Sequence, residues 1–117
     1  MRRSVLIVDD HAAFRAAARE LLEAGAFEVV GEATDGASAL AQAAELRPDV
    51  VLLDIQLPDT TGFTVAEQIA ELSDPPLVVL ISTREASAYR RRLDASRVRG
   101  FIAKGELTGP ALAELVR

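Results

Sequence analysis

The stretch Leu52–Phe63 reads LLDIQLPDTTGF, an apolar run that ends in an acid and is followed by a turn. Together with the two valines before it, the run is apolar at every position up to Asp54, which is typical of a parallel strand buried on both faces. Pro58 and Gly62 then punctuate the chain and indicate the turn. A buried strand thus carries a carboxylate to its very end, and we expect this carboxylate to serve a site.

Strand and helix patterns alternate on both sides of this stretch. Short apolar or β-branched runs predict strands, and the Ala-rich or amphipathic segments between them predict helices. The expected strands are Val5–Val8, Phe27–Ala33, Val50–Asp54, Leu77–Ser82 and Gly100–Ala103. The expected helices are His11–Glu23, Ala37–Leu46, Thr61–Leu72, Glu85–Ala95 and Thr108–Arg117. This order predicts an α/β domain in which helices cover both faces of a parallel sheet.

The composition predicts one soluble, globular domain. The chain has 117 residues, of which 50% are hydrophobic and 26% charged, and this length suffices for one core but not for two. It has no cysteine, so neither disulfides nor thiolate metal sites are expected. No apolar run approaches the ~20 residues of a membrane helix, and the start of the chain lacks a signal peptide pattern, so we expect a cytoplasmic protein. The net charge of −5 disfavours direct binding to nucleic acid.

Polar side chains stand at or just beyond the C-terminal ends of four expected strands. They are Asp9, Asp10, Asp54, Ser82, Thr83 and Lys104. In an open parallel sheet, ligand sites form beyond these ends, where the strand order reverses. If the first and third strands are neighbours, the three acids converge and raise one another's pKa. A divalent cation such as Mg²⁺ relieves this repulsion, and Lys104 adds a positive charge for an anionic ligand.

Each of these residues also has a simpler interpretation. Asp9 or Asp10 fits the role of a cap for the first helix, and hydroxyl side chains such as Ser82 are common caps too. A single lysine such as Lys104 is usually a solvated side chain. Their combination at the ends of separate strands favours a site over these alternatives.

Four segments resemble the receiver domain of response regulators, and they span the chain. They are VLIVDDH (5–11), DVVLLDIQLPDTTGF (49–63), LVVLIS (77–82) and GFIAK (100–104). Asp54, Leu57, Pro58 and Gly62 match the family's D-x-x-(M/L)-P-x-x-x-G signature. The resemblance implies a flavodoxin-like (βα)5 doubly wound sandwich, with a parallel sheet in the order 2-1-3-4-5.

Two features further resemble receivers that precede a LuxR-type helix-turn-helix domain. They are the DDH after the first strand and the segment VVGEATDGASAL (29–40). We therefore expect residues 1–117 to form a single receiver domain. The sequence leaves open whether the protein ends there or continues into a DNA-binding output domain.

The resemblance implies that Asp54 accepts a phosphoryl group from a histidine kinase or a phosphotransfer protein, which makes the domain a switch and not an enzyme. It also implies a Mg²⁺ site. Asp10 would hold the ion, with Asp9 helping through water. Asp54 and the backbone carbonyl of Gln56 would complete the protein ligands.

The same resemblance assigns the residues that sense the phosphate. Ser82 matches the hydroxyl that moves to meet it, with Thr83 as the alternative. Lys104 matches the lysine that pairs with the phosphoryl oxygens, and Phe101 matches the aromatic residue that changes its packing. The expected output surface is the fourth helix, fifth strand and fifth helix, which would control transcription. Homodimerisation on phosphorylation fits the family, and neither a membrane nor nucleic acid is an expected direct partner.

The sequence departs from the family at three places, and the first two of them leave a second function open. Thr83 stands where a small alanine is usual, Arg97–Gly100 lacks the first glycine of the usual turn, and Gly105 replaces the proline that often follows Lys104. A receiver-like interaction module that takes no phosphate is therefore the alternative. A flavin-binding domain of the same architecture is disfavoured because the loop after the first strand is acidic. A phosphatase is disfavoured because the chain has little room for a cap over a substrate.

Overall fold

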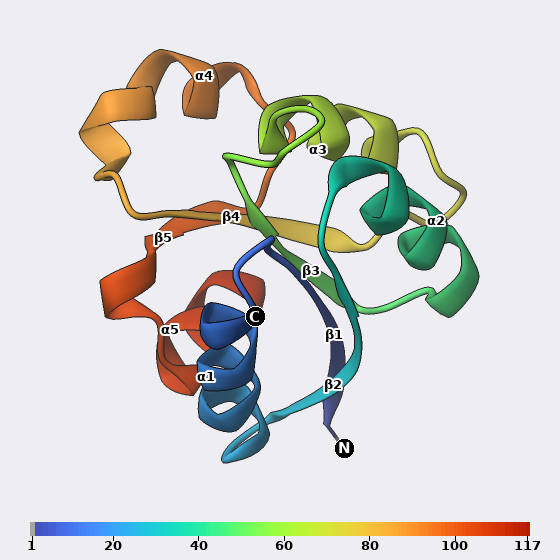
Figure 1. Cartoon of the computed structure of the whole chain (residues 1–117), viewed down its shortest axis with the longest axis vertical. Helices are drawn as coiled ribbons and strands as arrows, with labels where there is room; N and C mark the ends of the chain where they lie inside the picture. Colours follow the sequence, from blue (N-terminus) through green and yellow to red (C-terminus); the bar gives the residue numbers. More distant parts are fainter. Residues whose placement is uncertain (1) are drawn as a thin grey trace.

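Five parallel strands form one sheet in the computed structural model, which describes residues 2–117. The strands are β1 (Arg3–Val8), β2 (Phe27–Ala33), β3 (Val50–Asp54), β4 (Leu77–Ser82) and β5 (Gly100–Ala103). Their order is β2-β1-β3-β4-β5, with β2 and β5 at the two edges (Figure 1). The predicted fold class and strand order are both confirmed.

Helices cover both faces of the sheet. They are α1 (Ala12–Glu23), α2 (Gly36–Leu46), α3 (Gly62–Ala70), α4 (Arg90–Ala95) and α5 (Gly109–Val116), with the 3₁₀ helices η1 (Ala86–Tyr89) and η2 (Lys104–Glu106). α1 and α5 lie on one face, and α2, α3 and α4 lie on the other (Figure 1). Because strand residues alternate between faces, Val5 and Ile7 pack with α1 and α5, whereas Leu6 and Val8 pack with α2 and α3. No helix within residues 2–117 has the length and apolar character needed to cross a membrane.

The strand bounds agree with the predictions except that β1 begins at Arg3 instead of Val5. The expected helix Glu85–Ala95 is instead the 3₁₀ helix η1 followed by α4, with Tyr89 at φ −123° and ψ 10° between them. Neither η1 nor α4 contains a buried residue. The contacts of this segment with the core come from two half-buried residues, Tyr89 and Leu93, so tertiary packing gives it little reason to remain one regular helix.

Side-chain caps fix three helices. Asp35, Thr61 and Thr108 cap α2, α3 and α5 by accepting backbone hydrogen bonds. The N-cap of α1 is His11, so neither Asp9 nor Asp10 occupies the cap position considered for them.

The turn into β5 forms without its usual first glycine. Among residues 2–117, the non-glycine residues with positive φ are Arg47 and Asp74, and no glycine has positive φ. The N–H of Arg99 donates to the carbonyl of Val78 at 2.7 Å, which ties the turn to β4. The segment Arg97–Gly100 therefore fits the fold without any left-handed residue.

Candidate functional site

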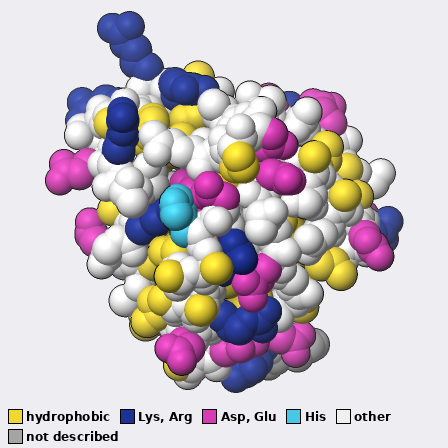
Figure 2. Space-filling model, in the orientation of Figure 1, with side chains coloured by type: hydrophobic (Ala, Val, Ile, Leu, Met, Phe, Trp, Pro, Cys, Tyr) yellow, Lys and Arg dark blue, Asp and Glu magenta, His cyan; other side chains and the backbone are white. Residues whose placement is uncertain are grey.

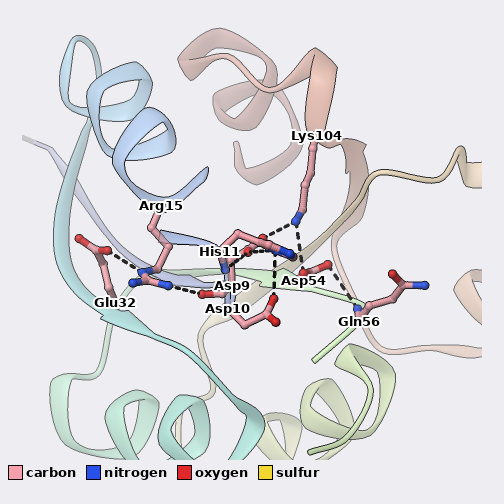
Figure 3. A network of polar contacts seen from close by, with 8 residues as sticks. All are labelled: Asp9, Asp10, His11, Arg15, Glu32, Asp54, Gln56 and Lys104. Atoms are coloured by element: carbon pink, nitrogen blue, oxygen red, sulfur yellow. Dashed lines mark hydrogen bonds and ion pairs between the residues drawn. The ribbon is translucent and has the colours of Figure 1, made fainter. Parts of the chain in front are cut away.

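The register of the sheet brings the candidate site residues together at the carboxyl ends of its strands. β1 pairs with β3 up to the residues just before Asp9 and Asp54, so these two acids lie side by side. β4 pairs with β5 up to Ser82 and Ala103, which brings Lys104 to the same end of the sheet. Figure 3 shows Lys104 pointing toward the two acids from the far side of the sheet. The acidic pocket predicted from the strand ends is present.

The loop after β3 folds back against its own strand, and Gly62 allows this close approach. A Cβ atom at Gly62 would lie 2.5 Å from the carbonyl oxygen of Asp54 and 2.9 Å from Cα of Ile55. The N–H of Gly62 donates to the carbonyl of Ile55 at 2.8 Å. The sharp turn after the acidic strand end therefore needs a residue without a side chain.

Asp9 and Asp54 are buried and share one ammonium group. Asp9 is 0% exposed and Asp54 is 3% exposed. Nζ of Lys104 lies 2.5 Å from Oδ2 of Asp9 and 3.3 Å from Oδ2 of Asp54. It also lies 4.7 Å from the ring centre of Phe14. Lys104 is the only lysine in the sequence, so the pocket holds a compact point charge in a chain whose other cationic side chains are mainly planar guanidinium groups.

Burial and neighbouring charges shift the pKa values of Asp54, Asp9 and Lys104 in different ways. Burial raises the pKa of Asp54, and the Asp9 carboxylate adds to this rise, whereas Lys104 offsets part of it. Burial also acts to raise the pKa of Asp9, but Lys104 and His11 outweigh it, so the pKa is lowered. Burial acts to lower the pKa of Lys104, but the two carboxylates outweigh it and raise the pKa. Asp9 and Lys104 thus form the stable ion pair, and Asp54 is the acid whose charge is less well satisfied.

Asp10 and His11 lie on the solvent side of the pocket. The Asp10 side chain is 37% exposed and that of His11 is 68% exposed. Nδ1 of His11 lies 3.0 Å from Oδ1 of Asp9 and 3.0 Å from Oδ1 of Asp10. Figure 2 shows this single histidine at the surface beside acidic side chains. His11 was not predicted as a site residue, and the only signal was its place directly after two acids.

The donor atoms suit a hard divalent cation. One ligand atom from each of Asp9, Asp10, His11 and Asp54 lies within 4.8 Å of the others. Oδ2 of Asp9 is buried without a hydrogen bond of normal geometry, although the Lys104 ammonium contacts it at 2.5 Å. Carboxylate oxygens with room for water on one side are what Mg²⁺ prefers, so these residues fit the ion. The backbone N–H of Gln56 donates to Oδ1 of Asp54 at 3.3 Å, and the role of its carbonyl as a ligand stays a prediction.

The two hydroxyl residues after β4 differ in burial. Ser82 is 1% exposed, whereas Thr83 is exposed. Oγ of Ser82 accepts a hydrogen bond from the N–H of Arg84 at 3.1 Å and lies 3.5 Å from the Tyr89 hydroxyl. Among residues 2–117, no hydrogen bond joins Ser82 to Asp54. The β4–α4 loop and Tyr89 therefore hold the Ser82 hydroxyl in this structure.

Tyr89 belongs to a row of aromatic rings beside the pocket. Its ring centroid lies 5.9 Å from that of Phe63 and 6.4 Å from that of Phe101. The guanidinium of Arg92 stacks 4.2 Å above the Phe63 ring. Phe101, the aromatic residue predicted to repack, is half-buried in this row. Tyr89 was not predicted as part of the site because its sequence neighbours mark it only as the start of a basic run.

Comparison with known proteins identifies the class. Residues 5–116 match the family described as the response regulator receiver domain, and the chain belongs to this family. It is similar in structure to the signal receiver domain of the response regulator NarL from Mycobacterium tuberculosis. That match has a TM-score of 0.84 and 34% identity, and it covers 98% of this chain and 96% of the other. A LuxR-family two-component response regulator from Aurantimonas sp. SI85-9A1 matches with a TM-score of 0.85 and 25% identity, covering 98% and 86% of the two chains.

The most similar relatives include transcription regulators. The chain is 38% identical over 106 residues to BvgA, a positive transcription regulator of virulence factors in Bordetella pertussis, covering 91% of this chain and 51% of BvgA. It is 29% identical over 103 residues to the DNA-binding transcriptional activator EvgA of Escherichia coli K12, covering 88% and 50%. The chain thus spans about half the length of these curated relatives. It is a receiver domain of the kind found in transcription regulators, which excludes the flavin-binding and phosphatase alternatives.

Proposed function

We propose that this domain is a phospho-accepting switch in which Asp54 takes a phosphoryl group from a histidine kinase or a phosphotransfer protein. The observation that carries the proposal is the position of Asp54. It is a buried carboxylate with a raised pKa, and it lies 3.3 Å from the Lys104 ammonium, which it shares with Asp9 at the end of β1. Such a carboxylate lies at the carboxyl end of its strand, close to groups that stabilise the charge of the product.

The transfer itself is a displacement at phosphorus. A carboxylate oxygen of Asp54 attacks the phosphorus of a phosphohistidine, the P–N bond breaks as the new P–O bond forms, and the imidazole leaves with the bonding electrons. Lys104 then turns its ammonium group from the carboxylates to the phosphoryl oxygens. Asp10, Asp9 and Asp54, with the carbonyl of Gln56, would hold Mg²⁺, which supplies charge to neutralise the phosphoryl oxygens.

The new group also biases the surface of the domain. A phosphoryl group adds negative charge and strong acceptor oxygens, so it attracts the Ser82 hydroxyl, or that of Thr83, away from its loop. Movement of Ser82 releases its contact with Tyr89, and Phe101 then repacks in the aromatic row. Coupling of this kind typically amounts to about 1–3 kcal/mol, which is enough to shift α4, β5 and α5 between two arrangements.

This surface is the proposed output of the switch. Residues 1–117 form one receiver domain, and we propose that it precedes a DNA-binding domain in a cytoplasmic transcription regulator, because the regulators it resembles are about twice as long. Membership of the receiver family implies a histidine kinase as the phosphoryl donor. Phosphorylation would favour a homodimer, and the domain itself would contact neither nucleic acid nor a membrane.

The test is intact-mass spectrometry after incubation with acetyl phosphate and Mg²⁺. We expect a gain of one phosphoryl mass, lost in Asp54→Ala and in EDTA. Asp74→Asn is the matched control, because it removes an exposed acid from the loop between α3 and β4, which lies at the start of a strand and not at its carboxyl end. Labelling that persists in Asp54→Ala contradicts the site assignment. A folded, Mg²⁺-binding chain that is labelled neither by acetyl phosphate nor by a cognate kinase is the non-phosphorylated interaction module instead.

A further inference from the structure

Hydrogen bonds hold the backbone of Asp9 on both sides of its Cα atom. The N–H of Asp9 donates to the carbonyl of Ala33 on β2 at 3.0 Å, which extends the β1–β2 pairing beyond the end of β1. The carbonyl of Asp9 accepts a hydrogen bond from Nη1 of Arg15 at 2.7 Å. Since this carbonyl belongs to the peptide that joins the two acids, its orientation sets the direction in which Asp10 leaves the backbone.

Asp10 has little else to hold it. Among residues 2–117, the one basic side chain within ion-pair distance of its carboxylate is that of His11, which is itself 68% exposed. A half-exposed acid with one exposed partner keeps its direction only if its backbone is fixed. The hydrogen bond from Arg15 to the Asp9 carbonyl supplies that fixation.

Arg15 is in turn held by Glu32 on the edge strand β2 (Figure 3). Nε of Arg15 donates to Oε1 of Glu32 at 2.9 Å, and the side chains are 16% and 30% exposed. Oε2 of Glu32 accepts from Nε and Nη2 of Arg19 at 3.0 and 2.9 Å. Burial alone would raise the pKa of Glu32, but the hydrogen bonds from Arg19 and Arg15 outweigh it and lower the pKa. Glu32 is therefore an ionised anchor that uses one oxygen for each arginine.

We infer that Arg15 is a positioning residue of the divalent-cation site, with Glu32 as its anchor: Arg15 orients the Asp9–Asp10 peptide so that the Asp10 carboxylate faces the bound ion. The inference rests on the proposed function, because it assigns a support to the Mg²⁺ site proposed there. The site residues that we expected from the sequence include neither Arg15 nor Glu32. Groups that orient metal ligands in this way typically change metal affinity or activity about 10–100-fold when removed.

The sign of the effect separates positioning from simple electrostatics. Arg15 carries a positive charge next to a cation site, so by charge alone its removal should tighten Mg²⁺ binding. If Arg15 orients Asp10, its removal should weaken binding despite the loss of repulsion. Arg15→Lys keeps the charge but not the planar, two-pronged donor set, so charge alone predicts no change for this variant and positioning predicts weaker binding.

The experiment is isothermal titration of Mg²⁺ into the whole chain, with thermal unfolding in EDTA to check that each variant is folded. We expect Arg15→Gln to weaken Mg²⁺ binding about tenfold and Arg15→Lys to weaken it less. Arg19→Gln is the matched control, because it removes an equal charge from the other oxygen of Glu32 and leaves the Arg15–Asp9 hydrogen bond in place. Its dissociation constant should stay within about twofold of the unmodified chain, as expected for a charge that makes no ligand contact.

The outcomes distinguish this inference from the proposed function. Equal or tighter binding in Arg15→Gln, with the unmodified chain binding Mg²⁺ normally, overturns the positioning role alone. Equal weakening in Arg15→Gln and Arg19→Gln also overturns it, because the effect then belongs to Glu32 or to local stability. Should Arg15→Gln fail to fold, weaker binding by folded Arg15→Lys supports the role and unchanged binding overturns it. An unmodified chain that binds no Mg²⁺ overturns the proposed metal site and this inference with it.

Discussion

Replacing Lys104 with methionine should destabilise the protein strongly in the absence of a divalent cation. The change removes an ammonium whose side chain is 11% exposed from between Asp9 and Asp54, whose side chains are 0% and 4% exposed. Removing one partner of a buried ion pair typically costs about 3–5 kcal/mol. We expect the lower end, about 3 kcal/mol, because Asp54 can bind a proton in response. For a chain of this size that corresponds to a melting temperature roughly 10 °C lower.

The stability lost in Lys104→Met should be larger at neutral pH than at acidic pH. The folded-state pKa of Asp9 is lowered, so its stabilising contribution is present above its unfolded value, near pH 4, and is lost as the pH falls through the folded value. The pKa of Lys104 is raised, so its contribution is present throughout the neutral range and is lost only at alkaline pH. The difference between the original chain and Lys104→Met should therefore be largest near pH 7 and shrink below about pH 4.

Thermal unfolding followed by circular dichroism in EDTA, between pH 3 and pH 7, measures both effects. Arg97→Met is the matched control, because it breaks the exposed pairs of Arg97 with Glu67 and Glu71, and exposed pairs contribute little to stability. Saturating Mg²⁺ should restore part of the loss in Lys104→Met, since the ion neutralises the same acids. Equal melting temperatures at pH 7, or a difference that does not change with pH, would refute the role of Lys104 as the counter-charge of the buried acids.

Three further predictions follow from separate contacts. Gly62→Ala should cost about 1–3 kcal/mol of unfolding free energy in denaturant titrations, because its Cβ would clash with β3, whereas Gly105→Ala, with no atom within 4 Å, should change little. Tyr89→Phe removes the hydroxyl that lies 3.5 Å from Ser82, so labelling by acetyl phosphate should become faster, by about 2–3-fold for one weak hydrogen bond; slower labelling contradicts the assigned contact. Asp59→Ala removes a carboxylate that accepts two N–H bonds at the start of α2 and has a lowered pKa. It should lower the melting temperature at pH 7, and the difference should shrink as the pH falls through the lowered folded-state pKa; a difference that does not change with pH contradicts the capping role.

Local composition predicted the sheet better than the region around α4, and burial explains why. β3 and β4 are packed on both faces, so burial constrains every residue and leaves a continuous apolar run. α4 and η1 contain no fully buried residue, and Tyr89 and Leu93 are only half-buried there. The exposed arginines of this segment are equally compatible with one continuous helix and with an interrupted one. The 3₁₀ helix after β5 also escaped prediction, because Gly105 carries no pattern that marks it.

In the candidate site, the residues at strand ends could be predicted from the sequence, whereas the residues that act through contacts between separate elements could not. Asp9, Asp54 and Lys104 could be placed because each follows a strand, and the topology of a parallel sheet fixes where strand ends lie. Arg15 and Glu32 could not be placed, because the hydrogen bonds of Arg15 to the Asp9 carbonyl and to Glu32 depend on how a helix turn faces an edge strand. Such contacts leave no spacing in the sequence, since the partners are many residues apart on unrelated elements.

The charge balance of the pocket explains why the cation and the phosphoryl group belong together. Asp9, Asp10 and Asp54 place three carboxylates around the single ammonium of Lys104, and this leaves an excess of about two negative charges that a divalent cation can balance. A phosphoryl group on Asp54 replaces a carboxylate by a group with more negative charge, so the balance held by the ion is no longer sufficient. In the proposed function, Lys104 would then be drawn from Asp9 toward the phosphoryl oxygens. Because Lys104 directly follows β5, this movement would connect phosphorylation to Phe101 and the surface around α4.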